Sequence, residues 1–525
     1  MGIPISRRKL LRGVGTAGVA GMVGIQPATA RRQDPLARYI VGTEPRRATV
    51  ARDAATEVYR ELDFGDVGQA VSGWFSEAAL SGLRNNPHVR YIEEEGVMEA
   101  IDHATDEDDG DPTEEQVLPW GIDRVDADVA HHEGETGGGS SVSIIDSGID
   151  PNHETLDVTG GEAFVACEGD CAEDWDDDNG HGTHCAGTAD ALDNEIGVVG
   201  VATEADLYAV KVLDGDGSGT FSDVAAGIEW SADQEIDVAS LSLGGGDSEA
   251  VRDACEYAYG KGTLLVAAAG NDGSRGPWST VNYPAAYEEV IAVSATDEDD
   301  NIASFSSVGN EIELAAPGVD VLSSVPGDGY DSWNGTSMAC PHVSGAGAQL
   351  MEHGLSNEQA RDRLNETAED IGLSDTEQGN GLLDVAAALD IEGGDGDGDD
   401  GSDDDDDGDG GDDGDGGDGG DDDGEETTSP VIDEFELTDR SNPRWARVKV
   451  EWAVSDDDGN LDTVESVLEL DGDELDAETS NVSGSDAAGE HELRERDGHG
   501  NTYDVTLTAT DADGKSTSET KQINL

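Results

Sequence analysis

The middle of the chain alternates short apolar runs with segments whose apolar residues recur every three to four positions. The runs are typical of buried strands and the periodic segments of helices. This alternation predicts an α/β fold over residues 113–392, a parallel sheet with helices on both faces. We expect strands at Val142–Ile145, Leu207–Val212, Val238–Leu243, Leu264–Ala268 and Val290–Val293, and helices at Ala225–Asp233, Ala250–Tyr259 and Ser337–Glu352.

A smaller unit precedes this region. Residues 31–112 contain strand-like runs at Tyr39–Val41 and Val89–Glu93, and helical spacing at Ala48–Leu62 and Ser76–Leu83. The pattern predicts a small α+β domain. It ends in an acidic stretch that is typical of an exposed, cleavable boundary.

A linker and a third domain follow. Residues 393–429 are mainly Asp and Gly and have almost no apolar surface to bury, which predicts an extended linker. A calcium-binding repeat array would need an apolar residue in each turn, and these residues lack it. Residues 430–525 alternate apolar and polar positions, as in Val448–Val454 and Tyr503–Ala509, which predicts an immunoglobulin-like β-sandwich.

The acidic excess is not confined to the linker. The chain has 120 acidic and 28 basic residues and a formal net charge of −92, and 120 − 20 = 100 acidic residues lie outside 392–426. Such self-repulsion opposes the compact state in dilute buffer, whereas molar salt screens it. The lysine-poor surface is similar to that of proteins from salt-loving archaea, and an acidic protein from ordinary medium is the alternative. The charge excludes nucleic acid as a partner.

The N-terminus predicts export. Twin arginines, Arg7 and Arg8, precede a glycine-rich apolar run at Val14–Ile25, and Ala28–Ala30 fits a signal-peptidase site. Residues 1–30 therefore resemble a twin-arginine signal of a secreted protein. The alternative is an uncleaved anchor, but the run is too short and glycine-rich to span a bilayer well. We expect no stable membrane insertion of the mature form.

The five cysteines leave at least one free thiol. Cys167 and Cys171 share a short loop and form either a small disulfide or two free thiols.

Three segments carry the candidate chemistry. The apolar run Val142–Ile145 delivers Asp146, where open α/β sheets place their sites. Glycines flank His181, and a small-residue helix follows it. Ser337 lies at a helix start, where the dipole and a free backbone N–H favour an oxyanion. A hydroxyl nucleophile, a base and a group that orients the base are what acyl transfer needs.

The segments around Asp146, His181 and Ser337 resemble those of the subtilisin-like serine proteases, and the whole is similar to the haloarchaeal halolysins. The match covers about 116–391. The resemblance implies a secreted endopeptidase with Asp146, His181 and Ser337 as its triad, broad protein or peptide substrates and no catalytic metal. It also implies that residues 31–112 are an inhibitory propeptide, removed by self-cleavage near Asp106–Gln116.

The resemblance implies further site residues. Asn271 matches the donor that completes the oxyanion hole with the Ser337 backbone N–H. The remaining matched positions would bind the substrate backbone and its primary side chain, and Asn282 stands where many members have Gly, which predicts a shallower pocket. These positions are Ser242, Leu243, Gly244, Gly245, Ala268, Gly270 and Asn282.

A structural calcium site is a further implication of the resemblance. Its matched ligands are Gln116, Leu192, Asn194, Ile196 and Val198. The family's Asp ligand aligns with Thr155, which leaves the site open. Cys185 resembles the buried cysteine of proteinase K-like members.

Two other functions remain as alternatives. In the first, the protease domain is vestigial and the C-terminal sandwich acts as a binding module. The second is a lipase or esterase, which needs Gly-x-Ser-x-Gly around the nucleophile, whereas Gly335–Ala339 does not supply it.

Overall fold

The computed structural model describes residues 36–101, 104–105, 116–169, 171–194, 196–273, 279–391, 429–439, 445–456, 459–470, 473–482, 484–496, 501–512 and 515–525. The predicted export signal and almost all of the predicted linker lie outside these ranges. Within them, no helix is both long and apolar enough to span a membrane.

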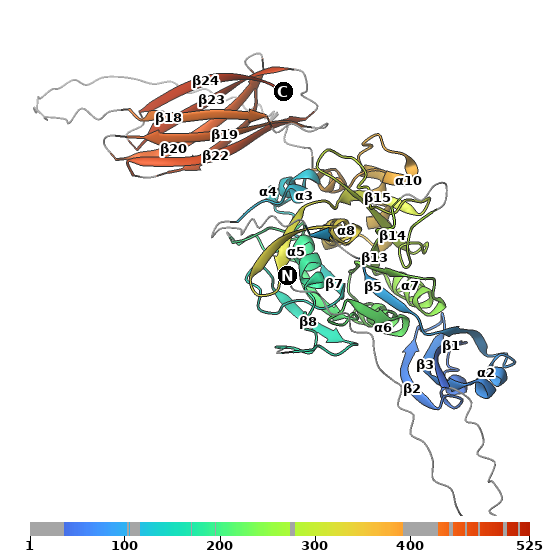
Figure 1. The fold of residues 1–525 in the computed structure, drawn as a ribbon. Coiled ribbons are helices and arrows are strands. Elements are labelled where there is room, and N and C mark those ends of the chain that lie inside the picture. Colours follow the sequence, from blue (N-terminus) through green and yellow to red (C-terminus); the bar gives the residue numbers. More distant parts are fainter. Residues whose placement is uncertain are drawn as a thin grey trace, which may run out of the picture.

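A seven-stranded parallel sheet organises residues 116–391, in the order β15-β14-β13-β11-β7-β9-β8. Figure 1 labels β7, β8, β13, β14 and β15 of this sheet. The five predicted strands are confirmed, except that Leu243 starts a separate strand, β12 (Leu243–Gly245). The sheet comprises β7 (Ser141–Asp146), β8 (Val158–Ala163), β9 (Asp206–Lys211), β11 (Val238–Leu241), β13 (Leu264–Ala268), β14 (Val290–Thr296) and β15 (Ile312–Pro317).

Alternate side chains of each strand enter two different cores, because successive residues of a strand point to opposite faces. In β13, Leu264 and Val266 pack on one face and Leu265 on the other. Helices α5 (His181–Asp190) and α8 (Thr336–Glu352) contribute to the first core, and α6 (Phe221–Asp233) and α7 (Glu249–Lys261) to the second. The predicted sheet with helices on both faces is therefore confirmed.

Shorter elements complete this domain. They are α3 (Trp120–Arg124), α4 (Ala127–His132), β10 (Ser218–Thr220), the hairpin of β16 (Val321–Val325) and β17 (Gly329–Asn334), α9 (Asn357–Thr367), α10 (Asp375–Gln378) and α11 (Val385–Ala388).

The N-terminal unit is an antiparallel sheet in the order β2-β3-β1-β4 with two short helices. The predicted helix over 76–83 is confirmed, and Ser76 caps it by accepting a hydrogen bond from Ala79. The predicted helix over 48–62 is wrong beyond Arg52. Residues 57–63 form a strand instead, because pairing with β3 outweighs their helical spacing. The elements are β1 (Leu36–Thr43), α1 (Thr49–Arg52), β2 (Glu57–Asp63), β3 (Gln69–Ser76), α2 (Glu77–Leu83) and β4 (Val89–Glu94).

The segment after this unit joins the larger domain. Strand β5 (Val97–Ala100) runs between β10 and β12 and is antiparallel to both. Strand β6 (Ala104–Thr105) pairs with Trp333 and Asn334 of β17. Segments about 120 to 230 residues apart in the sequence therefore form the two small sheets beside the carboxyl ends of the parallel strands.

The described residues of 429–525 form the predicted β-sandwich. Its sheets have the orders β18-β19-β22 and β21-β20-β23-β24, and their inner faces share one apolar core. The strands are β18 (Val431–Asp439), β19 (Trp445–Ser455), β20 (Leu461–Leu470), β21 (Asp473–Asn481), β22 (Asp486–Arg496), β23 (Thr502–Asp511) and β24 (Ser516–Asn524).

Candidate active site

Asp146 and His181 meet at the carboxyl edge of the parallel sheet. Asp146 ends β7, near the middle of the sheet, and His181 begins α5. The His181 ring Nδ1 lies 2.8 Å from Asp146 Oδ1, and both side chains are fully buried. Burial lowers the pKa of His181, but the Asp146 carboxylate outweighs it, so the net pKa lies well above its ordinary value. The acid thus favours the imidazolium that forms when the ring accepts a proton.

Ser337 is the second residue of α8 and is also fully buried. Its Oγ lies 3.2 Å from the Ser242 carbonyl oxygen and 3.3 Å from that of Ile101. Ile101 directly follows β5, so the hydroxyl faces a peptide carbonyl of the chain's own N-terminal part.

Asn271 lies beside the start of α8. Its Oδ1 accepts hydrogen bonds from the Thr336 backbone N–H at 3.0 Å and the Thr336 hydroxyl at 3.1 Å. These two donors hold the carbonyl side of the amide and thereby fix the orientation of its Nδ2. A Cβ on Gly335 would lie 3.2 Å from this Nδ2, so glycine keeps the approach to the amide open.

The predicted substrate-binding residues of β12 pair with an extended segment, β5. The Ile101 N–H donates to the Ser242 carbonyl at 3.5 Å, and Gly244 is the partner of Glu99 in the β12–β5 ladder. On the other side, β10 pairs with β5 along Ser218–Thr220. An extended peptide therefore binds here as the middle strand of three.

The structure also brings the predicted primary pocket residues together. A Cβ on Gly244 would lie 3.1 Å from Asn282 Cβ and 3.3 Å from Ile101 Cδ1. The Asn282 side chain covers Gly270, where a Cβ would clash with its Nδ2. Gly270 also has a φ of +114°, a conformation that favours glycine. Ala268, the last residue of β13, is fully buried.

The five predicted calcium ligands also lie together, but their donor set does not fit a calcium ion well. Gln116 Nε2 donates to the carbonyls of Leu192 at 2.8 Å and Val198 at 3.3 Å, while Asn194 Oδ1 accepts from Ile196. Thr155 occupies the place of the expected carboxylate. Its hydroxyl contacts His153 Nδ1 at 2.9 Å and Ser324 Oγ at 2.8 Å. Calcium sites normally combine carbonyls with carboxylates, and none of these residues supplies one.

Sequence reasoning missed the charged residues beneath the candidate triad. Asp177 accepts hydrogen bonds from Ser147 Oγ, from the backbone N–H groups of Asn179, Gly180 and Thr183, and from the Thr183 hydroxyl. Lys211, the last residue of β9, is fully buried. The only available signal was a lysine at the end of an apolar strand in a lysine-poor chain.

The cysteines divide into two groups. Cys167 and Cys171 form a disulfide, which settles the open alternative, whereas Cys185, Cys255 and Cys340 are buried free thiols. Cys185 Sγ lies 4.0 Å from His181 Nδ1, but burial raises the pKa of the thiol. Since the thiolate is the reactive form, this direction disfavours a cysteine nucleophile.

An acid, a histidine and a serine at the carboxyl edge of a parallel α/β sheet are typical of hydrolytic enzymes that use a serine nucleophile. Comparison with known proteins identifies the family. Residues 137–381 match the subtilase family model. Subtilisin NAT from Bacillus subtilis subsp. natto is 41% identical over 362 residues, which cover 67% of this chain and 90% of that protein. Subtilisin DY from Bacillus licheniformis is 49% identical over 276 residues, 52% of this chain and 99% of that protein. The chain belongs to the subtilase family and is a subtilisin-like serine endopeptidase.

Proposed function

We propose that Ser337 is the nucleophile, His181 the general base and Asp146 the group that orients His181. Ser337 Oγ attacks the scissile carbonyl, and its proton passes to His181 Nε2. Asp146 holds the ring through Nδ1 and stabilises the imidazolium. His181 returns the proton to the leaving amine, and water then hydrolyses the acyl-enzyme by the same route.

The oxyanion formed on attack would be bound by Asn271 Nδ2 and the Ser337 backbone N–H. The hydrogen bonds from Thr336 to Asn271 Oδ1 support this role, because they fix the amide before the charge develops.

The position of the chain's own residues 97–101 is the main support for this proposal. Strand β5 occupies the place of a substrate, and the Ile101 carbonyl oxygen lies 3.3 Å from Ser337 Oγ. We infer that residues 36–101 act as an inhibitory propeptide that presents its own end to the active site.

Contacts of the N-terminal unit with helix α7 support inhibition. Glu93 accepts hydrogen bonds from the backbone N–H groups of Glu249 and Ala250, the first residues of α7. A carboxylate at a helix N-terminus interacts favourably with the helix dipole. Arg90 adds a two-contact ion pair with the buried Asp253, at 2.5 and 2.9 Å. These contacts align the unit so that β5 enters between β10 and β12.

The same geometry favours Ile101–Asp102 as the self-cleavage bond. The sequence alone suggested Asp106–Gln116, which lies outside the described residues except for Gln116. In the structure, however, Ile101 presents its carbonyl to Ser337 and its N–H to Ser242. Hydrolysis would release a carboxylate on Ile101 and an amino group on Asp102, and one water molecule would be consumed.

N-terminal sequencing of protein expressed at high salt tests the proposal. The wild-type chain should yield a product that begins at Asp102, and Ser337→Ala should remain uncut and lose about 10⁶-fold in turnover, a magnitude known from subtilisin itself. Ser344→Ala is the matched control, because its hydroxyl donates within α8 to Cys340 and should leave cleavage intact. A trimmed Ser337→Ala product in the absence of another protease would contradict the proposal.

We further propose that the enzyme is exported and acts on proteins at high salt. Arg7 and Arg8 support a twin-arginine route, and the net charge of −92 supports salt dependence. Replacement of both arginines by lysine should retain the precursor inside the cell. Secretion of the double variant at the wild-type level would contradict this route.

A further inference from the structure

The residue after Asp146 connects the catalytic acid to the loop that carries His181. Ser147 N–H donates to Asp146 Oδ1 at 2.7 Å. Its Oγ donates to Asp177 at 2.9 Å and accepts from the Gly182 N–H at 2.9 Å. The orientation of Asp146 and the position of His181 therefore depend on the same residue.

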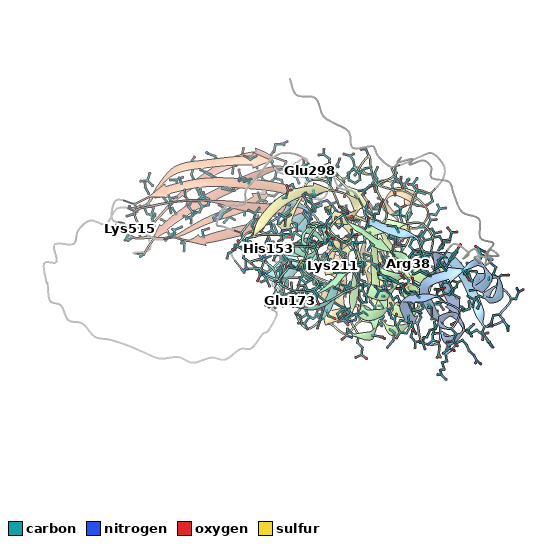
Figure 2. All side chains as sticks on the ribbon, turned by 60° about the horizontal axis from the view of Figure 1, so that its bottom comes forward. Arg38, His153, Glu173, Lys211, Glu298 and Lys515 are labelled. Carbon is teal, nitrogen blue, oxygen red and sulfur yellow. A yellow bond between two sulfur atoms is a disulfide. The ribbon has the colours of Figure 1, made fainter. Side chains whose placement is uncertain are left out.

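Lys211 extends this connection with a buried charge. Its Nζ donates to the Ser147 carbonyl and lies 2.5 Å from Asp178 Oδ1. The lysine side chain is 0% exposed and that of Asp178 is 8% exposed. Figure 2 labels Lys211 within the peptidase domain. A buried lysine is stable only when it is paired, and this one joins the end of β7 to the loop before α5.

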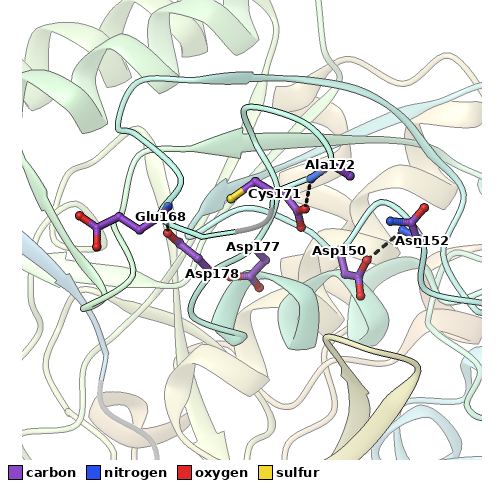
Figure 3. A pocket seen from close by; sticks show the side chains of 8 residues that line it. Asp150, Asn152, Glu168, Cys171, Ala172, Asp177 and Asp178 are labelled. Atoms are coloured by element: carbon purple, nitrogen blue, oxygen red, sulfur yellow. Dashed lines mark hydrogen bonds between the residues drawn. The ribbon is translucent and has the colours of Figure 1, made fainter.

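Asp178 is held from a second side. Its Oδ2 accepts a hydrogen bond from the Glu168 N–H at 2.6 Å, and Glu168 lies in the loop closed by the Cys167–Cys171 disulfide. Figure 3 shows Asp178 beside Glu168. Both residues line a pocket of about 410 Å³, as does Asp177. The cross-linked loop thus limits the movement of the carboxylate that pairs with Lys211.

Given the proposed roles of Asp146 and His181, we propose that Lys211 and Asp178 form a positioning pair for the catalytic acid and base. The pair keeps the end of β7 and the loop before α5 in register, so that Asp146 Oδ1 stays 2.8 Å from His181 Nδ1. It also balances charge beneath the site: Lys211 neutralises Asp178, whose chain neighbour Asp177 is a second buried acid.

The two members of the pair should shift the acid limb of the pH–rate profile in opposite directions. His181 contacts the titratable groups of Asp146 from β7 and Cys185 from α5, and Lys211 contacts the carboxylate of Asp178. Lys211→Met leaves a negative charge, which favours the imidazolium, so the acid limb should move to higher pH. Asp178→Asn leaves a positive charge, so the limb should move to lower pH.

The test compares Lys211→Met, Asp178→Asn and the double variant in the full-length chain after self-processing. We expect kcat for a small peptide to fall about 10- to 100-fold in Lys211→Met with little change in KM, because the loss acts through orientation. Lys211→Arg should keep the limb near its wild-type pH, and the double variant should return it there. Lys261→Met is the matched control, because Lys261 is exposed and lies at the end of α7.

Unchanged kcat and an unchanged acid limb in both single variants would overturn the inference. If Lys211→Met fails to fold, Asp178→Asn still tests it, since it keeps the shape of the side chain and predicts a shift of opposite sign. A limb that stays in place while only thermal stability falls would mean a purely structural pair and would also overturn it. Wild-type activity that does not depend on Ser337 would instead contradict the proposed function.

Discussion

His181 in the peptidase domain and His491 in the C-terminal sandwich are both buried, but their neighbours differ. His181 faces a carboxylate at the end of a parallel strand, which raises its pKa. His491 lies in β22 between two hydroxyls, with Nδ1 2.8 Å from Ser466 Oγ and Nε2 2.9 Å from Ser480 Oγ. Burial lowers the pKa of His491 to about 4.

A serine beside a histidine therefore does not by itself make a hydrolytic site. His491 is only 2% exposed and packs near Trp452, with ring centroids 5.4 Å apart. Among the described residues, the strands of the sandwich pair only with one another, whereas β10 and β12 pair with β5 from the N-terminal part of the chain. The carboxylate of Asp146, the proposed oxyanion donor Asn271 and the pairing of β10 and β12 with an extended segment distinguish the surroundings of His181 from those of His491.

Removal of the acid should have the largest effect. Asp146→Asn should lower kcat about 10⁴-fold, because the amide no longer selects the tautomer in which His181 Nε2 can accept a proton. Ser480→Ala changes a Ser–His contact of the sandwich and should leave kcat unchanged. Peptide hydrolysis by the two purified variants at high salt measures the contrast, and a kcat for Asp146→Asn within tenfold of wild type would contradict it.

Loss of the proposed oxyanion donor should have the next largest effect. Asn271→Ala should lower kcat about 10²–10³-fold with a smaller change in KM, the magnitude found for such a donor in subtilisin itself. Asn301→Ala is a suitable control, because its exposed side chain donates to Asp297 in a surface turn. Equal losses in the two variants would show that Asn271 acts through stability alone.

Dilution of salt should unfold the acidic peptidase domain more readily than any chelator does. From molar NaCl to about 0.1 M the Debye length rises from about 3 to 10 Å, and carboxylate repulsion returns. Unfolding of Ser337→Ala, followed by circular dichroism, measures the change without self-digestion. A chelator at constant molar salt should shift the midpoint little, because Thr155 replaces the expected carboxylate. A large shift of the midpoint by the chelator would instead indicate that calcium binds at the predicted site.

Acidification should weaken the sandwich by a moderate amount. The unfolded chain binds a proton at His491 near pH 6.5, whereas the folded chain does so only near pH 4. The free energy of unfolding therefore falls as the pH decreases through this window and is fully present above it. Hydrogen exchange of the β19 and β22 amides in the full chain measures the loss. His491→Gln should remove most of this pH dependence, and an unchanged profile in that variant would point to another group.

Removal of the sandwich should have the smallest effect on catalysis. Every candidate catalytic residue lies before residue 392, so a chain that ends there should keep kcat/KM within about twofold at molar salt. Peptide hydrolysis by the truncated and full-length enzymes measures the ratio. Complete loss in a folded truncation would show that the sandwich contributes to catalysis or maturation.

Local patterns were sufficient to predict most elements and the candidate triad. Val142–Ile145 and Leu264–Ala268 are apolar runs bounded by turn residues, and such runs form strands without information from elsewhere in the chain. The glycines around His181 and the helix start at Ser337 are equally local. The physical reason is that strand length, helix spacing and turn residues depend on neighbours only a few positions apart.

The tertiary structure alone decided which distant segments meet. Residues 57–63 became a strand because β3 lies beside them, against their helical spacing. Strand β5 lies between β10 and β12 and is held by backbone hydrogen bonds. Such bonds do not depend on the side chains, so the sequence gives no sign of this pairing. Lys211 and Asp178 form an ion pair because β9 pairs with β7 and the loop before α5 lies close to the end of β9. Such contacts depend on how the sheet is ordered, and the order of strands is not encoded in any single stretch of the sequence.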